Sequence, residues 1–450
     1  MKLKNVIHKT ILILILAFFS TACPLETACH ANSETEFMPE IALLLTTINY
    51  YAEGILDSAF GNGGIVTYDT GSVNDQGNDL VIQPDGKILI TGNTGNFPED
   101  MAIWRYNSDG SPDATFGTDG VVGYDSGGAT ERGQDIAVQP DGKIVVTGTA
   151  TLTGTNMGIW RYNSNGTPDG TFGSGGLVIS DPATGAENGL GLAIQTDGKI
   201  VVTGYIVNTD ADMGIWRYNS NGTLDGTFGS GGIATYDGGG TADWGQAIAL
   251  QADGKIVVTG YKVNTSNDMV IWRYNSNGTL DGTFGSGGIV TYDSGNNDVG
   301  LALALQSDGK IVVTGYKVNT DTNMGIWRYN SNGTLDVTFG IGGIVTYDSG
   351  NNDQGVDLVI QPDGKVVVAG YIFNTNEDMA IWRYNSNGTL DTSFGGGRGF
   401  VMHNNAAGGN GFDTGFGVAL SLQRRLYKIV VVGRSDNASA NFDMAVWQYK

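Results

Sequence analysis

Short apolar runs alternate with glycine-rich turns from residue 56 to residue 450. In the most regular stretch the runs are residues 288–292 (GIVTY), 301–306 (LALALQ), 310–315 (KIVVTG) and 324–330 (MGIWRYN). Several runs are apolar at successive positions, as at 144–146 and 200–202, which is typical of strands covered on both faces. Because the connections are too short for crossover helices, the pattern predicts four-stranded antiparallel sheets.

This four-strand unit recurs along the chain, and each copy carries a tryptophan in its third run. The tryptophans lie at 104, 160, 216, 272, 327, 382 and 447, spaced by 56 or 55 residues until a final interval of 65 around an insertion at 404–411. Seven meanders of this kind, set around an axis, make a seven-bladed β-propeller with four antiparallel strands per blade. A linear β-solenoid fits less well, because its coils are shorter and parallel.

The two ends of the repeat region are out of phase. The run GIVTY at 64–68 precedes the first complete unit, whereas the chain ends just after the tryptophan run at Trp447. If the tryptophan strand is third in its blade, the first run supplies the missing fourth strand of the last blade. The sequence therefore predicts that residues 64–69 lie beside residues 442–449 and close the ring.

The repeated motif also resembles a known family. Gln-Pro-Asp-Gly-Lys-Ile-Val-Val-Thr-Gly at 139–148, followed by Trp-Arg-Tyr and then Asp-Gly-Thr-Phe-Gly, is similar to the delta-60 repeat. That family is more loosely akin to NHL repeats and occurs in bacterial exported and surface proteins, mostly of unknown function. The resemblance covers roughly residues 56–450; it implies a β-propeller and transfers no catalytic residue.

The first residues have the features of an export signal. Lys2, Lys4 and Lys9 precede an apolar run at 11–19 and small residues at 20–22, which predicts a signal peptide over 1–22 and a tether over 23–55. No other apolar segment reaches the roughly 20 residues of a membrane span, so none is predicted. Residues 19–23 resemble a bacterial lipobox that would make Cys23 a lipid anchor, although Ser20 replaces the usual leucine; cleavage after Ala31 would instead release the protein.

Composition narrows the classes of partner. The 71 glycines and the Val/Ile/Thr/Tyr-rich runs suit an all-β protein. No cysteine follows Cys29, so the repeats contain no disulfide. A formal charge of −22 argues against nucleic acid and anionic lipid as partners. We expect a monomeric ring outside the cytoplasm, on the cell surface, in a periplasm or in the medium, with a protein or glycan partner.

Sequence variation is concentrated at one end of the predicted sheets. Asp-Gly-Lys and Asn-Ser-Asn-Gly-Thr turns repeat almost unchanged at the other end, whereas loops such as 93–100, 181–189 and 435–443 differ. Variable loops on a rigid scaffold commonly form binding surfaces. Trp244, beside Asp243, and Phe97 are unusual aromatic residues there and predict stacking on a sugar, although Trp244 could instead pack on a neighbouring loop.

Three further groups of residues bear on chemistry. Asp79, Asp135 and Asp357 recur just before the predicted innermost strand, at the mouth of the central channel, and could bind a cation or water, act as paired acids of a hydrolase, or have a structural role, which we favour. Calcium is a candidate cofactor because residues 107–113 (NSDGSPD) resemble half a calcium loop. The arginines after the tryptophans are expected to pair with carboxylates such as Asp113 rather than form an anion-binding ring.

These patterns predict an exported, surface-associated binding or scaffold module that is not an enzyme. The alternative is a carbohydrate-active hydrolase that uses the aspartates near the innermost strand. Because His403 is the only histidine beyond residue 31, a Ser-His-Asp triad or a histidine metal site is disfavoured.

Overall fold

The strands of the protein follow the predicted apolar runs. The computed structural model describes residues 50–51, 53–71, 73–151, 154–180, 185–239, 242–439 and 441–450, all within the compact unit Tyr50–Lys450. In this part of the chain every regular element is a strand except the 3₁₀ helix η1 (Gly395–Gly397). None of the described residues forms a helix long and apolar enough to cross a membrane. The predicted signal peptide, Cys23 and most of the tether lie outside the described residues.

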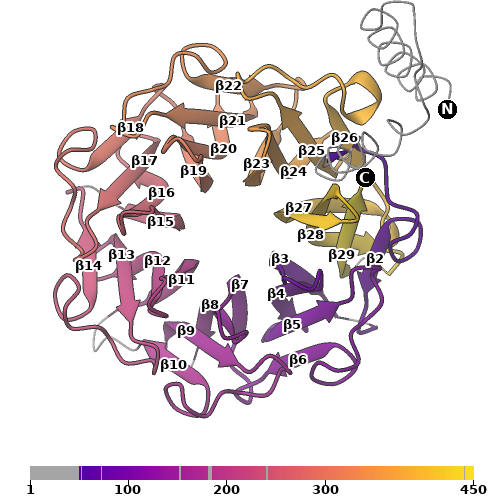
Figure 1. Cartoon of the computed structure of the whole chain (residues 1–450), viewed down its shortest axis with the longest axis horizontal. Coiled ribbons are helices and arrows are strands. Elements are labelled where there is room, and N and C mark those ends of the chain that lie inside the picture. The colour runs from indigo at the N-terminus through magenta and orange to yellow at the C-terminus, as the bar shows by residue number, and fades with distance from the viewer. Residues whose placement is uncertain are drawn as a thin grey trace, which may run out of the picture. The chain divides into compact units, whose positions relative to one another are not determined.

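The sheets are antiparallel meanders arranged around an axis (Figure 1). The strands nearest the axis are β3 (Asp75–Ile82), β7 (Glu131–Val138), β11 (Glu187–Ile194), β15 (Ala242–Leu250), β19 (Asp298–Leu305), β23 (Asp353–Ile360) and β27 (Gly408–Gln423). The second strands are β4 (Ile88–Thr94), β8 (Ile144–Thr151), β12 (Ile200–Val207), β16 (Ile256–Val263), β20 (Ile311–Val318), β24 (Val366–Phe373) and β28 (Leu426–Asn437).

The third strands carry the tryptophans, and the short outer strands follow them. The third strands are β5 (Asp100–Tyr106), β9 (Thr155–Tyr162), β13 (Ala211–Tyr218), β17 (Asn267–Tyr274), β21 (Thr322–Tyr329), β25 (Glu377–Tyr384) and β29 (Phe442–Tyr449). The outer strands are β6 (Val121–Tyr124), β10 (Leu177–Ser180), β14 (Ile233–Tyr236), β18 (Ile289–Tyr292), β22 (Ile344–Tyr347), β26 (Phe400–His403) and β2 (Ile65–Tyr68).

The sheet that contains β29 joins the two ends of the repeat region. Its outer strand is β2, which pairs antiparallel with β29 so that Ile65 lies opposite Trp447 and Tyr68 opposite Met444. This is the pairing that the phase difference in the sequence predicts. The sheet also gains a strand that we did not predict, because β1 (Tyr50–Tyr51) pairs parallel with β28. The compact unit starts at Tyr50.

The tryptophans pack between neighbouring sheets, as predicted. Trp104 on β5 is fully buried and belongs to one apolar cluster with Val430 and Val432 of β28. The ring of Tyr68, on the outer strand of that neighbouring sheet, meets the Trp104 indole edge-on with centroids 5.5 Å apart. A large aromatic side chain in this position contributes much of the buried area between two sheets.

The arginine after each tryptophan pairs with an aspartate, which confirms the predicted pairing. Arg161 and Asp169 are both buried, and an Arg161 guanidinium nitrogen lies 2.7 Å from Asp169 Oδ2. Lys143 Nζ lies 3.2 Å from the same oxygen, and Thr171 Oγ1 donates to Oδ1 at 2.7 Å. Arg161 also donates to the carbonyl oxygen of Ser220 in the next repeat. Although burial opposes it, these partners hold the pKa of Asp169 well below its usual value.

Equivalent pairs occur in the other repeats that carry an arginine here. The pairs are Arg105–Asp113, Arg217–Asp225, Arg273–Asp281, Arg328–Asp336 and Arg383–Asp391, with nitrogen–oxygen distances of 2.7–2.8 Å. All lie at the end of the sheets that carries the Asp-Gly-Lys turns, which we call the turn face. These arginine side chains therefore form ion pairs within the protein.

The buried ion pair predicts a large loss of stability when its carboxylate is removed. Asp169→Ala should lower the free energy of unfolding by about 3 kcal/mol, because Arg161 would remain buried without its partner. Chemical denaturation of the full chain measures this change. Asp141→Asn is the matched control, since it removes only the exposed partner of Lys143 and should change stability by less than about 0.5 kcal/mol. Equal effects of the two substitutions would contradict the assignment.

Candidate functional site

The opposite end of the sheets, which we call the loop face, carries the loops between second and third strands and the connections from each outer strand to the next inner strand. Each inner strand carries one buried acidic residue at this end of the sheet. These residues are Asp75, Glu131, Glu187, Asp243, Asp298, Asp353 and Asp413, with exposed fractions of 0–3%. The preceding connection caps them: Gly238 N donates to Asp243 Oδ2 at 2.7 Å and Ser294 N donates to Asp298 Oδ2 at 2.7 Å.

Trp244 belongs to a row of aromatic side chains on the loop face. Its indole lies 4.1 Å from the ring of Tyr205 and 5.8 Å from the ring of Tyr261, centroid to centroid, nearly parallel to the latter. Trp244 is half-buried between these second-strand tyrosines. The structure thus places Trp244 in an aromatic row. Its predicted partner Asp243 is buried instead and accepts a hydrogen bond from Gly238 N of the preceding connection.

The row continues into a pocket of about 500 Å³ that crosses the loop-face ends of three consecutive meanders. Tyr261, Tyr316 and Tyr371 line it from β16, β20 and β24. The other lining residues are Gln246, Asn297, Val299, Leu301, Val318, Thr322, Asn352 and Gln354. The lining therefore combines aromatic rings with uncharged amides and hydroxyls and includes no carboxylate.

The backbone geometry explains how these tyrosines reach the pocket. The inner strand β15 is bulged between Gly245 and Ala247, and its partner strand carries Gly260 just before Tyr261. A Cβ atom on Gly260 would lie 1.8 Å from the carbonyl oxygen of Trp244, so only glycine fits there. The bulge and the glycine bring the two strands together immediately beneath the aromatic row.

The pocket tyrosines are hydrogen-bond donors rather than bases. Burial and the neighbouring hydroxyls of Tyr316 and Tyr205 raise the pKa of Tyr261 to about 12. Burial, together with Glu377 and Tyr316, also raises the pKa of Tyr371 to about 12, and its hydroxyl donates to Gln354 Oε1 at 2.8 Å. Both phenols are neutral at physiological pH and suit recognition of polar, uncharged groups.

Asp79, Asp135 and Asp357 lie within the inner strands β3, β7 and β23, not just before them as predicted, and they connect adjacent inner strands. Asp79 Oδ2 accepts from Ile136 N at 3.1 Å, and Asp135 Oδ2 accepts from Leu192 N at 2.6 Å. Asp357 Oδ2 accepts from Val418 N at 2.7 Å. Each carboxylate thus bonds the backbone of the next inner strand, which supports the structural role. None of the three lines the 500 Å³ pocket.

The same three aspartates have raised pKa values. Burial and the neighbouring Asp79 raise the pKa of Asp357 to about 7, and burial raises the pKa of Asp135 to about 6. Burial, followed by the charge of Asp135, also raises the pKa of Asp79, and the carboxyls of this pair hydrogen-bond to each other. The folded protein therefore takes up protons here at pH values where the unfolded chain has lost them.

Phe97 and the oxygen-rich turn at 107–113 lie away from the pocket. Phe97 is 85% exposed in the loop between β4 and β5, on a different sheet from Trp244. In the turn, Asp109 Oδ1 accepts from the Ser111 backbone N–H and hydroxyl at 3.0 and 2.7 Å. Asp113 is paired with Arg105 and Lys87. These two carboxylates thus accept hydrogen bonds within the turn and form ion pairs with Arg105 and Lys87.

Carboxylates gather instead at two places on the loop face within the described residues. One group is Asp100, Asp125 and Glu131, and the other is Asp212, Asp237 and Asp243. In each group, one oxygen from every residue lies within 4.8 Å of the others. These groups are not evident from the sequence, because each combines side chains from two repeats. The recurring Tyr-Asp at the end of the outer strands was the available signal.

Comparisons with known proteins agree with the fold. A family model described as a β-propeller domain of unknown function (DUF5122) matches residues 83–116, 139–172, 195–228, 251–284, 306–339 and 361–394. Each matched segment contains the second and third strands of one meander. Together with the observed sheets, the matches identify the chain as a β-propeller repeat protein. No curated protein matches the chain.

Several solved structures resemble the chain at low sequence identity. The polysaccharide lyase Uly1 is 11% identical, with 90% of this chain and 96% of that chain covered and a TM-score of 0.48. A Bacteroides caccae protein of unknown function is 14% identical, with 67% and 91% covered and a TM-score of 0.41. The propeller domain of the Pyrococcus furiosus Trilobed protease is 11% identical, with 84% and 96% covered and a TM-score of 0.40. Similarities this weak carry no argument about function.

The raised pKa of Asp357 predicts how stability depends on pH. Its carboxyl titrates near pH 7 when folded and near its usual 3.8 when unfolded, so its ionisation destabilises the fold as pH rises through that window. Asp357→Asn keeps an acceptor for Val418 and removes the charge. We expect it to stabilise the protein by about 1 kcal/mol at pH 8, with a gain that vanishes towards pH 4. A gain or loss independent of pH in thermal unfolding would contradict this.

Proposed function

We propose that the chain is an exported, surface-associated, seven-bladed β-propeller that binds an uncharged carbohydrate on its loop face without transforming it. The observation that carries the proposal is the 500 Å³ pocket lined by three tyrosines and by uncharged amides. Aromatic faces stack on the apolar face of a sugar ring, while amides and phenols bond its hydroxyls. A protein ligand is the competing outcome.

The proposed ring consists of seven four-stranded meanders closed by strand pairing rather than by a covalent bond. The pairing of β2 with β29 supports this closure. The contact between the inner strands β3 and β27 also supports it. The apolar run at 11–19 supports export, with Cys23 as the proposed lipid anchor or, if cleavage follows Ala31, with no anchor.

The two ends of the meanders support placing the ligand on the loop face. On the turn face, carboxylates are paired with arginine and lysine of the same chain, as in Asp113 with Arg105 and Lys87. On the loop face, the pocket presents tyrosine rings and amides that are only partly buried, such as Gln246 and Gln354. The loop-face pocket therefore presents uncharged aromatic and amide side chains to an external partner.

The chemistry of the pocket favours binding over hydrolysis. Glycoside hydrolysis uses two carboxyl groups on opposite sides of the scissile bond. The pocket lining contains no such group, and Asp79, Asp135 and Asp357 accept hydrogen bonds from neighbouring inner strands. Its phenols have pKa values too high to act as bases at neutral pH.

The proposal predicts that binding depends on the middle tyrosine of the pocket. On an oligosaccharide array and in affinity electrophoresis with neutral polysaccharides, Tyr316→Ala should weaken binding by roughly tenfold, the equivalent of about 1.4 kcal/mol. Tyr316→Phe should retain most of the binding that comes from stacking. Trp244→Ala should weaken binding less, because Trp244 supports Tyr261 from beside the pocket.

Phe97→Ala is the matched control, because Phe97 is an exposed aromatic residue elsewhere on the loop face. It should leave binding within about twofold of the unaltered protein. Release of new reducing ends from a bound polysaccharide would replace the proposal with the hydrolase. Binding that survives Tyr316→Ala but not Phe97→Ala would move the site away from the pocket.

A further inference from the structure

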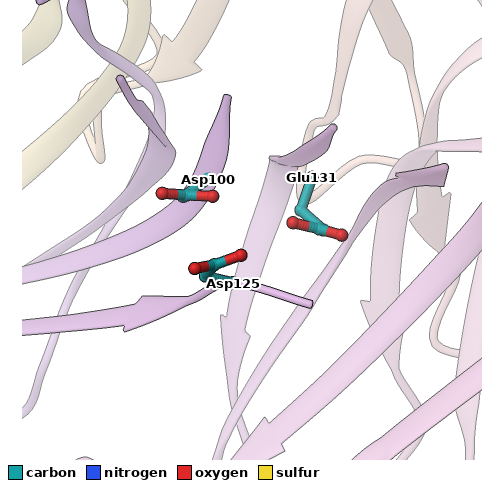
Figure 2. A group of neighbouring side chains, drawn as sticks. All are labelled: Asp100, Asp125 and Glu131. Carbon is teal, nitrogen blue, oxygen red and sulfur yellow. The ribbon is translucent and has the colours of Figure 1, made fainter. Parts of the chain in front are cut away.

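Asp100, Asp125 and Glu131 converge from two adjacent sheets. Asp100 begins β5, Asp125 follows the outer strand β6, and Glu131 begins β7 of the next sheet. Figure 2 shows the three carboxylates gathered at this junction. One oxygen from each lies within 4.8 Å of the others. Two oxygens bound to one calcium ion are separated by at most about 5 Å, since calcium–oxygen distances are about 2.3–2.6 Å, so the spacing suits a shared cation.

A buried oxygen in this group lacks a partner. Glu131 has an exposed fraction of 0%, and its Oε1 is bonded by the Ser126 hydroxyl. Its Oε2 is also buried and has no hydrogen-bond partner. Leaving a buried carboxylate oxygen unpartnered is costly, and the cost rises when other carboxylates lie beside it. Burial and the charges of Asp100 and Asp125 raise the pKa of Glu131 accordingly.

The same arrangement occurs two repeats later. Asp212 lies on β13, Asp237 follows β14, and Asp243 lies near the start of β15. Asp243 is 3% exposed; Gly238 N donates to its Oδ2, whereas its Oδ1 is buried and has no partner. Each of the two groups therefore contains a buried carboxylate oxygen without a hydrogen-bond partner, supplied by Glu131 in one group and by Asp243 in the other.

We propose that each of these two groups binds a calcium ion that links adjacent sheets on the loop face. Three carboxylate oxygens would supply part of the six to eight oxygen ligands that calcium takes. Water molecules would supply the remaining ligands from the solvent-exposed side of each site, where Asp125 and Asp237 lie. The ion would neutralise the mutual repulsion of the carboxylates and bond the oxygen that is otherwise unpartnered. This inference rests on observations independent of the carbohydrate pocket.

The two sites differ in their surroundings. Lys262 lies opposite Asp243 in the pairing of β15 with β16, and its charge opposes the rise in the pKa of Asp243. This ammonium group competes weakly with a cation, so the Asp100 site should be the tighter of the two. With three carboxylates and several waters, both sites should fall in the range of extracellular modules, with Kd values of about 10⁻⁴–10⁻³ M.

Calcium titration of the full chain by isothermal calorimetry and thermal unfolding tests the inference. The unaltered protein should bind calcium saturably and show a higher Tm in about 5 mM CaCl2. Asp125→Asn and Asp237→Asn should each remove about one bound ion, and the double variant should lose both. In these variants an amide oxygen can still accept from Gly127 N or Gly239 N, which should preserve the loops.

Asp141→Asn is the matched control, because Asp141 is an exposed aspartate that accepts from Lys143 N in a similar turn on the turn face. It should leave calcium binding unchanged. Three results would overturn the inference: no saturable binding up to about 10 mM calcium, an unchanged number of bound ions in the double variant, or an equal rise in Tm with NaCl of matched ionic strength.

Discussion

The structure depends on the fact that each sheet is apolar on both faces. On β12, Ile200, Val201 and Val202 are all fully buried, yet Ile200 and Val202 pack in one cluster and Val201 in the next. No sheet can therefore bury its residues alone, and each requires a neighbour on both sides. Residues far apart in the sequence meet in this way too, because Val430 and Val432 of β28 pack in one cluster with Ile88 and Ile90 of β4.

This arrangement leaves the two ends of the sheets free to differ, and they use carboxylates in opposite ways. On the turn face Asp169 is surrounded by Arg161, Lys143 and Thr171, which lower its pKa even though it is buried. On the loop face burial, and after it the charges of neighbouring carboxylates, raises the pKa values of Glu131 and Asp243. The first arrangement stabilises the protein by itself. The second favours a bound cation, and the aromatic pocket lies on the same face.

Much of the fold could be predicted because the repeat presents each interaction several times. The strand runs, the buried tryptophans and the Arg–Asp pairs all recur at fixed spacing, and the odd strand at 65–68 revealed its pairing with β29. The site was predicted less well. Phe97 and Trp244 stand out in the sequence because they break the repeat, but the pocket is lined by Tyr261, Tyr316 and Tyr371, which occupy one repeated position. The sequence indicates that Asp79 lies near the axis, but it does not indicate that the Asp79 carboxylate accepts a hydrogen bond from Ile136 N of the next inner strand.

In the proposed function, the loop face binds the ligand while the ion pairs of the turn face stabilise the fold. Hydrogen–deuterium exchange of the full chain tests that division most directly. It is measured with and without calcium, and with and without the carbohydrate that binds on the oligosaccharide array. We predict slower exchange with ligand at residues 125–130, 293–297, 319–321 and 348–352, and no change in the turns at 83–87 and 139–143. Protection confined to those turns would contradict the account.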